Sequence, residues 1–91
     1  MKTARIDGAT IGSVAELHEA LRRGLDLPAH TAPNLDALWD TLTRDLPGPA
    51  AVEISGVPAL RRRLGAGARR VLELLAEVAA ERSDFAVTLR D

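Results

Sequence analysis

The chain contains no cysteine and no tyrosine, and its aromatic side chains are limited to Trp39 and Phe85. Without cysteine it can form no disulfide bond, no thiolate nucleophile and no cysteine-ligated zinc site, which excludes thiol redox chemistry and fits a reducing compartment. With two such side chains it also lacks an aromatic platform on which nucleic-acid bases could stack. We therefore expect a fold that is stabilised by its hydrophobic core alone.

Long hydrophobic runs are also missing from this sequence. No segment approaches the roughly 18 apolar residues of a membrane-spanning helix, and the N-terminal segment Met1 to Asp7 lacks the apolar core of a secretory signal peptide. We therefore expect a cytoplasmic protein. The 91 residues are 46% hydrophobic and 27% charged, which is typical of a globular chain, and we expect one domain over residues 1–91.

Three short β-prone segments alternate with helical ones. The strands are expected at residues 2–7, 50–55 and 85–89, where Phe85, Val87 and Leu89 alternate toward the core. The helices are expected from Ser13 to about Gly24, from residue 34 to the stop at residues 47–49, and over residues 58–64 and 68–82. A helical crossover between successive strands predicts an α/β fold with a small three-stranded parallel sheet, right-handed connections and helices packed against it.

Charge is unevenly spread, although the net charge is only −1. Residues 26–53 carry five carboxylates against one arginine, whereas residues 57–70 carry five arginines and no carboxylate. A second acidic ridge is predicted where Glu73, Glu77 and Glu81 line one side of a helix. The acidic half favours a basic partner, and the arginines favour a phosphate backbone. Both interpretations are open on charge alone.

The segment from Asn34 to Asp40 is the most informative. At 100° per residue, four leucines share one face of the expected helix, and Asp36 and Asp40 lie together on the next, with Trp39 at the border. Like charges four residues apart on a helix repel by about 0.2–0.5 kcal/mol, so stability alone does not explain this pair. We interpret it as a surface kept acidic for a partner.

Catalytic and metal sites are weakly supported. His30 with Asp36 or Asp40 could provide acid–base catalysis or part of a metal site, but no nucleophile and no phosphate-binding glycine loop accompany them. His18 borders the inner stripe of its helix and is interpreted as structural or surface-exposed. No cluster has convincing metal-ligand spacing. We therefore expect neither an enzyme nor a bound cofactor or metal.

The run Leu25-Asp26-Leu27-Pro28, followed after five residues by Asn34-Leu35-Asp36-Ala37-Leu38-Trp39-Asp40-Thr41-Leu42-Thr43, closely resembles the barstar family. The resemblance extends from Lys2 to Leu89. Members of this family are intracellular inhibitors of secreted guanyl-preferring ribonucleases such as barnase. The fold of the family, a three-stranded parallel sheet with packed helices, agrees with the order of elements predicted above.

The resemblance implies a role for each acidic residue. Asp40 would take the place of a substrate phosphate among the basic side chains of the nuclease, and Asp36 would pair with a cation beside the active site. Trp39 would supply apolar contact, Glu77 an additional charge pair and Glu81 a contact at the rim. The implied partner is a basic ribonuclease bound one-to-one by a chain that is monomeric when free.

Some positions depart from the family pattern. His30-Thr31-Ala32 stands where a barstar loop has Tyr-Tyr-Gly, and histidine becomes cationic below about pH 6.5. Asp45 stands where barstar has an aromatic residue. We count His30, Asn34, Arg44 and Asp45 among the candidate partner-binding residues. The alternative is a barstar-fold module that binds another protein, or that binds RNA through the stretch from Arg61 to Arg70.

Overall fold

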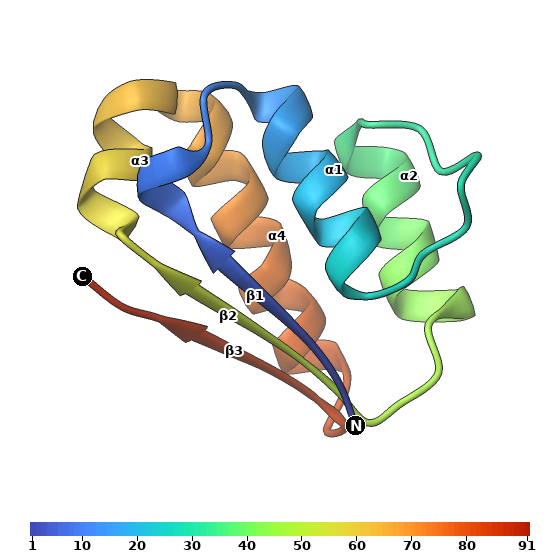
Figure 1. Cartoon of the computed structure of the whole chain (residues 1–91). Helices are drawn as coiled ribbons and strands as arrows, with labels where there is room; N and C mark the ends of the chain where they lie inside the picture. The colour runs from blue at the N-terminus through green and yellow to red at the C-terminus, as the bar shows by residue number, and fades with distance from the viewer.

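A computed structural model describes residues 1–91 as one parallel sheet with helices on it (Figure 1). The strand order is β1-β2-β3, and both strand pairs are parallel. The elements in chain order are β1 (Lys2–Asp7), the 3₁₀-helix η1 (Gly8–Thr10), α1 (Val14–Gly24), α2 (Leu35–Asp40), the π-helix η2 (Thr41–Asp45), β2 (Ala50–Ser55), α3 (Val57–Leu64), α4 (Ala66–Glu81) and β3 (Phe85–Leu89). The predicted three-stranded parallel α/β fold is confirmed.

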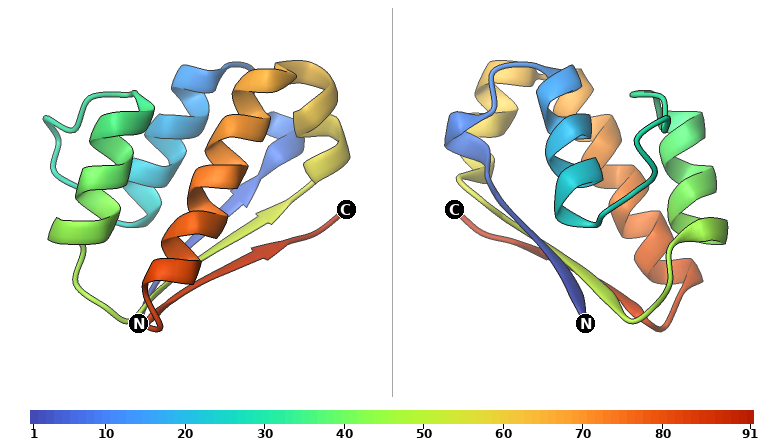
Figure 2. Two further views of the ribbon diagram at one scale, coloured as in Figure 1. Left: turned by 180° about the vertical axis from the view of Figure 1, so that it is seen from behind. Right: turned by 45° about the vertical axis from the view of Figure 1, so that its right-hand side comes forward.

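All four α-helices lie on one face of the sheet, and the other face is open (Figures 1 and 2). Side chains of successive strand residues point to opposite faces, so Ala4 and Ile6 of β1 are buried while Arg5 between them is exposed. On the open face Arg5, Glu53 and Thr88 occupy neighbouring positions in register. The Arg5 Nε lies 3.8 Å from the Glu53 Oε1. The open face is therefore polar, as the alternation of its strands requires.

The hydrophobic core lies between the sheet and the helices. Its fully buried members include Leu17 and Leu21 of α1, Leu42 of η2, and Val71 and Leu75 of α4. Burial of one such side chain contributes about 1.5–3 kcal/mol. None of the helices of the structure is both long enough and apolar enough to cross a membrane.

The start of α1 follows the predicted Ser-x-x-Glu pattern. The Ser13 Oγ accepts a hydrogen bond from the Glu16 N–H at 3.1 Å, and the Glu16 carboxylate accepts one from the Gly12 N–H at 3.0 Å. At its other end α1 presses on β1, since a Cβ at Gly24 would lie 2.5 Å from the Ala4 Cβ. Glycine at position 24 is therefore required for this close approach.

Three expectations about elements were wrong in detail. The helix that follows Asn34 is not regular to its end, because the Leu46 N–H donates to the Thr41 carbonyl, and residues Thr41–Asp45 form a π-helical turn. Leu89 was expected to face the core, but it is 41% exposed because it lines an open hollow beside Leu72 and Ala76 of α4. The last long helix also begins earlier than residue 68, directly after Gly65, whose φ of 57° ends α3.

Candidate functional site

The acidic helix α2 begins at a well-formed N-cap. The Asn34 Oδ1 accepts a hydrogen bond from the Ala37 N–H at 2.8 Å, which satisfies one of the amides that the first helical turn leaves unpaired. Asp36 lies in this first turn, where the helix dipole stabilises an anion. The N-cap at Asn34 therefore places Asp36 in the first turn of α2, and the Asp36 side chain is exposed.

Helix α2 packs beside α4 (Figure 2). Residues of the two helices line a shallow hollow of about 310 Å³. Asp36 and Trp39 line it from α2, and Arg70, Glu73 and Glu77 line it from α4. Trp39 is half-buried and packs on the hydrophobic core. The structure therefore brings together three of the predicted site residues, Asp36, Trp39 and Glu77, from two helices that are distant in the sequence.

We call the four exposed carboxylates of these two helices, Asp36, Asp40, Glu77 and Glu81, the acidic face. Asp40 lies one helical turn beyond Asp36, and Glu81 one turn beyond Glu77. None of the four takes part in an ion pair within the chain. Their charges are therefore available to a cationic partner.

The loop before α2 carries His30. Its Thr31 N–H donates to the Pro28 carbonyl at 3.0 Å, which closes a turn around an exposed His30. His30 lines none of the hollows beside α2. Beneath the loop lies His18, which is only 6% exposed and lines the hollows on both sides of Pro33. Burial lowers the pKa of His18, so its imidazole is neutral at pH 7.

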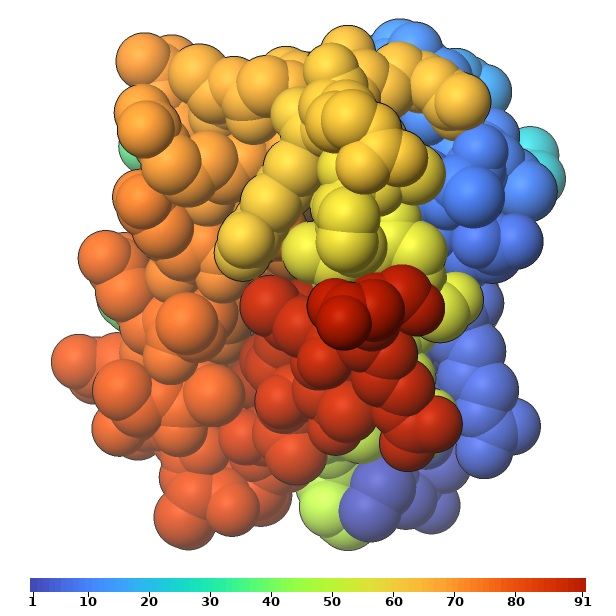
Figure 3. Space-filling view, turned by 90° about the vertical axis from the view of Figure 1, so that its left-hand side faces the viewer, coloured from blue at the N-terminus to red at the C-terminus, as the bar shows by residue number.

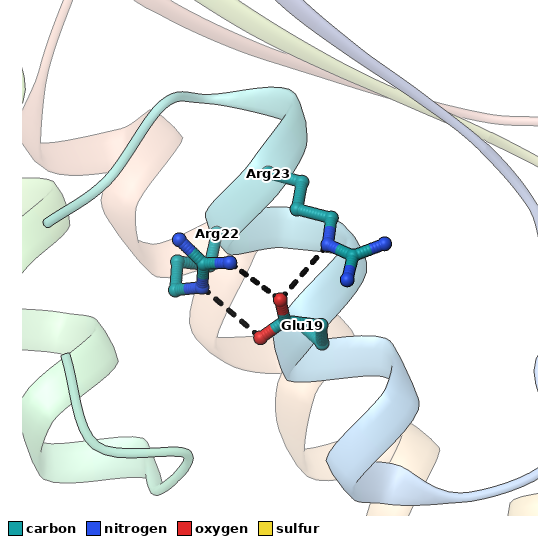
Figure 4. A network of polar contacts seen from close by, with 3 residues as sticks. All are labelled: Glu19, Arg22 and Arg23. Atoms are coloured by element: carbon teal, nitrogen blue, oxygen red, sulfur yellow. Dashed lines mark hydrogen bonds and ion pairs between the residues drawn. The ribbon is translucent and has the colours of Figure 1, made fainter. Parts of the chain in front are cut away.

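A network of polar contacts lies in α1, close to where this loop begins (Figure 4). The Glu19 carboxylate accepts hydrogen bonds from the Arg22 Nε at 3.0 Å and from the Arg23 Nε at 2.9 Å. These bonds, chiefly that with Arg22, lower the pKa of Glu19 to about 2. Arg22 also lines the small hollow under Thr31 and Ala32. The network therefore reinforces the last turn of α1 where the loop departs.

A comparison with protein families decides the relationship. The model of the family described as "Barstar (barnase inhibitor)" matches residues 1–90. The chain belongs to the barstar family. It is also 34% identical over 84 residues to the Bacillus subtilis (strain 168) protein named "Putative ribonuclease inhibitor YrdF", which covers 92% of this chain and 92% of that protein. Membership of the barstar family points to an inhibitor rather than an enzyme.

Two further candidate residues of this barstar-family chain lie on η2, which continues directly from α2, and Arg44 follows Asp40 by four residues. Arg44 and Asp45 are exposed on η2, and neither lines a hollow beside α2. No group of three or more His, Cys, Asp or Glu side chains is arranged to hold a metal ion. The acid–base or metal interpretation of His30 with Asp36 or Asp40 therefore gains no geometric support.

Sequence reasoning missed the clamp that holds the end of η2. The Arg82 Nη1 donates to the carbonyls of Leu42 at 2.7 Å and Leu46 at 2.9 Å. The other side of the guanidinium binds the Asp84 carboxylate through two hydrogen bonds of 2.9 Å. This pairing lowers the pKa of Asp84 and raises that of Arg82. No local signal could reveal the contacts with η2 and Leu46, because the Leu42 and Leu46 carbonyls lie far from Arg82 in the sequence.

Arg70 is the second residue that was missed. It was counted with the arginines of a basic stretch, yet it lines two hollows beside α2, both together with Asp36. Its position was detectable, since residues 70, 74 and 77 share one flank of a helix. The other arginines separate as well: Arg63 donates to the carbonyls of Ala9 and Ile11 at 2.8 and 3.1 Å, whereas Arg61 and Arg69 line a hollow elsewhere. The stretch therefore does not form one continuous basic face.

Proposed function

We propose that this protein inhibits a small, basic, secreted-type ribonuclease inside the cell that makes it, by covering the nuclease active site with the acidic face. The observation that carries the proposal is that Asp36 of α2 and Glu77 of α4 line one hollow with the half-buried Trp39, and neither carboxylate takes part in an ion pair within the chain. Family membership and the name of the Bacillus subtilis relative support the same role.

The chemistry of the acidic face suits a ribonuclease. The active site of such an enzyme gathers cationic side chains around a substrate phosphate, and a carboxylate accepts paired hydrogen bonds from an arginine much as two phosphate oxygens do. By the family resemblance Asp40 occupies the phosphate position, with Asp36 and Glu77 pairing with flanking cations. Trp39 contributes apolar contact area and braces α2, because large aromatic side chains anchor interfaces.

The loop at His30 sets partner choice in this proposal. Two aromatic residues of the family pattern are replaced by His30 and Thr31. A neutral imidazole can still stack on an enzyme side chain, whereas a cationic one faces a basic active site unfavourably. Arg70 adds a cation beside Asp36 on the same surface. We therefore propose a guanyl-preferring nuclease whose surface offers a carboxylate or a neutral group opposite Arg70.

The first experiment measures inhibition of RNA cleavage by a panel of small guanyl-preferring ribonucleases. We expect tight one-to-one inhibition by the wild-type chain. Asp40→Ala should weaken it by about thirtyfold or more, since removal of one partner from a desolvated charge pair costs about 2–5 kcal/mol. The matched control is Asp91→Asn, which removes a carboxylate on the far side of the molecule (Figure 1). Undiminished inhibition by Asp40→Ala would overturn the active-site mechanism.

A second candidate function follows from the altered loop. Because His30-Thr31-Ala32 replaces the aromatic pattern, the same acidic face could be matched to a basic protein other than a ribonuclease. No inhibition across the panel, together with capture of a basic protein that is released by Asp36→Asn and Asp40→Asn, would favour this candidate. Binding of RNA through the arginines is not favoured, because the structure divides them among separate surfaces.

A further inference from the structure

The flank of α4 that faces away from α2 borders the largest hollow of the surface, about 590 Å³. Figure 3 faces this side, where α3 in yellow, α4 in orange and β3 in red meet. Its floor is apolar and includes Leu72, Ala76 and Leu89, and its rim carries Arg61 and Arg69. Leu89 and Met1 are the only exposed large hydrophobic residues of the chain. Neither the core nor the acidic face accounts for the exposure of Leu89.

The hollow adjoins an unprotected sheet edge. The Ala50 N–H donates to the Asp84 carbonyl, and the Arg90 N–H donates to the Ile54 carbonyl. The backbone N–H and C=O groups of the even-numbered residues along β3 therefore point toward β2. In a parallel ladder the intervening residues, Val87 and Leu89, direct their backbone groups to the outer side. The opposite edge strand β1 carries three charged residues, whereas Phe85–Leu89 carries none. Charged residues commonly protect edge strands from pairing, and β3 lacks them.

The hollow is lined by two arginines, Arg61 and Arg69, and by one carboxylate, Glu73, so its net charge is positive. Arg61 has no carboxylate within ion-pair distance, and the Arg69 Nε lies 3.8 Å from the Glu73 Oε1, with both side chains about two-thirds exposed. Such an exposed pair contributes little and is readily exchanged. The first turn of α4 contains no acidic residue to offset the positive end of its dipole. An apolar floor, an unpaired strand edge and two arginines are complementary to an extended peptide that carries a carboxylate.

We propose that β3 and this hollow form a second binding site, which takes an extended peptide segment as an added strand. The peptide backbone pairs with Val87 and Leu89, one apolar side chain covers Leu72 and Ala76, and a carboxylate binds Arg61 and Arg69. Strand addition of this kind gains affinity from main-chain hydrogen bonds and specificity from alternate side chains. The carboxylate belongs to an acidic side chain or to a chain terminus. The peptide site and the hollow beside the acidic face lie on different flanks of α4 and share only Glu73 among their lining residues.

The test is titration of the full ¹⁵N-labelled chain with the peptide Thr-Val-Thr-Val-Asp-Val bearing a free C-terminus. We expect amide shifts centred on Val87 and Leu89, and loss of binding when alternate peptide amides are N-methylated. Arg61→Glu combined with Arg69→Glu should weaken binding about tenfold or more. Arg62→Glu is the matched control, since Arg62 is exposed but does not line the hollow. Amidating the terminus or replacing Asp with Asn identifies which carboxylate binds.

Several results would overturn the proposal. They are the absence of shifts at Val87 and Leu89, equal binding of the N-methylated peptide, and equal binding by the Arg61 and Arg69 double variant. Amide shifts at β3 that change with protein concentration in the absence of peptide would show that the strand edge binds a second copy of the chain instead. Displacement of the peptide by hexauridylate would show that the two arginines bind phosphate groups instead of a peptide carboxylate. Ribonuclease inhibition is measured separately, so failure of either site leaves the other result standing.

Discussion

Among single residues, His18 is the histidine whose ionisation is changed by burial. Its imidazole is buried under the loop that leads to α2, and burial lowers its pKa below the usual 6.5. A lowered histidine pKa means that the unfolded chain binds a proton more readily than the folded one. Its stabilising effect is complete above about pH 6.5 and is lost as the pH falls toward the folded-state pKa.

We therefore predict that the free energy of unfolding decreases from pH 7 to pH 5 by up to about 1.4 kcal/mol per pH unit. Glu19 and Asp84 also have lowered pKa values, but they titrate below this range and do not contribute there. Urea unfolding at several pH values measures the slope. His18→Gln should flatten it, and His30→Gln, which changes an exposed histidine, should leave it intact. An unchanged slope in His18→Gln would show that another group is responsible.

Among the elements, the joint between η2 and the end of α4 depends on one guanidinium. Arg82→Ala should lower the free energy of unfolding by about 1–3 kcal/mol, because the carbonyls of Leu42 and Leu46 lose their donor. The exposed Arg62→Ala control should stay within about 0.5 kcal/mol of wild type. Hydrogen exchange should also accelerate at the Leu46 amide, which closes the π-helical turn. If Arg82→Ala and Arg62→Ala had the same free energy of unfolding, water would be replacing the hydrogen bonds of Arg82 without loss of stability.

Features that depend on residues close in the sequence could be predicted, whereas features that depend on contacts between distant residues could not. The exposure of Asp36 and Asp40 follows from helical periodicity, and the cap at Asn34 follows from its local sequence. The parallel sheet follows from the alternation of strands and helices. The π-helical turn and the Arg82 clamp depend on contacts between distant residues, and Leu89 is exposed because of its position at a sheet edge. The alternation of residues in a strand predicts which face of the strand is apolar, but it does not predict how far the helices cover that face.

For the whole molecule, the net charge of −1 implies that long-range attraction to a basic partner comes from the acidic face and not from the total charge. Under the proposed function we predict that association with the nuclease slows as salt is added. Salt shortens the Debye length from about 10 Å at 0.1 M to about 3 Å at 1 M. Stopped-flow association rates measure this dependence, and Asp36→Asn with Asp40→Asn should make it shallower. A rate that does not change with salt would exclude steering by this face.

The parallel sheet has a consequence for the order in which the protein is built. Residue Lys2 pairs with Ala50, and Ala50 in turn pairs with Phe85, so neither strand pair can form from neighbouring sequence. Contacts between distant residues slow folding, because loop closure costs entropy before the contacts form. During synthesis β1 must wait for β2, and the sheet remains incomplete until β3 has left the ribosome. Under the proposed function, a nascent chain therefore offers no protection against a nuclease until β3 has emerged.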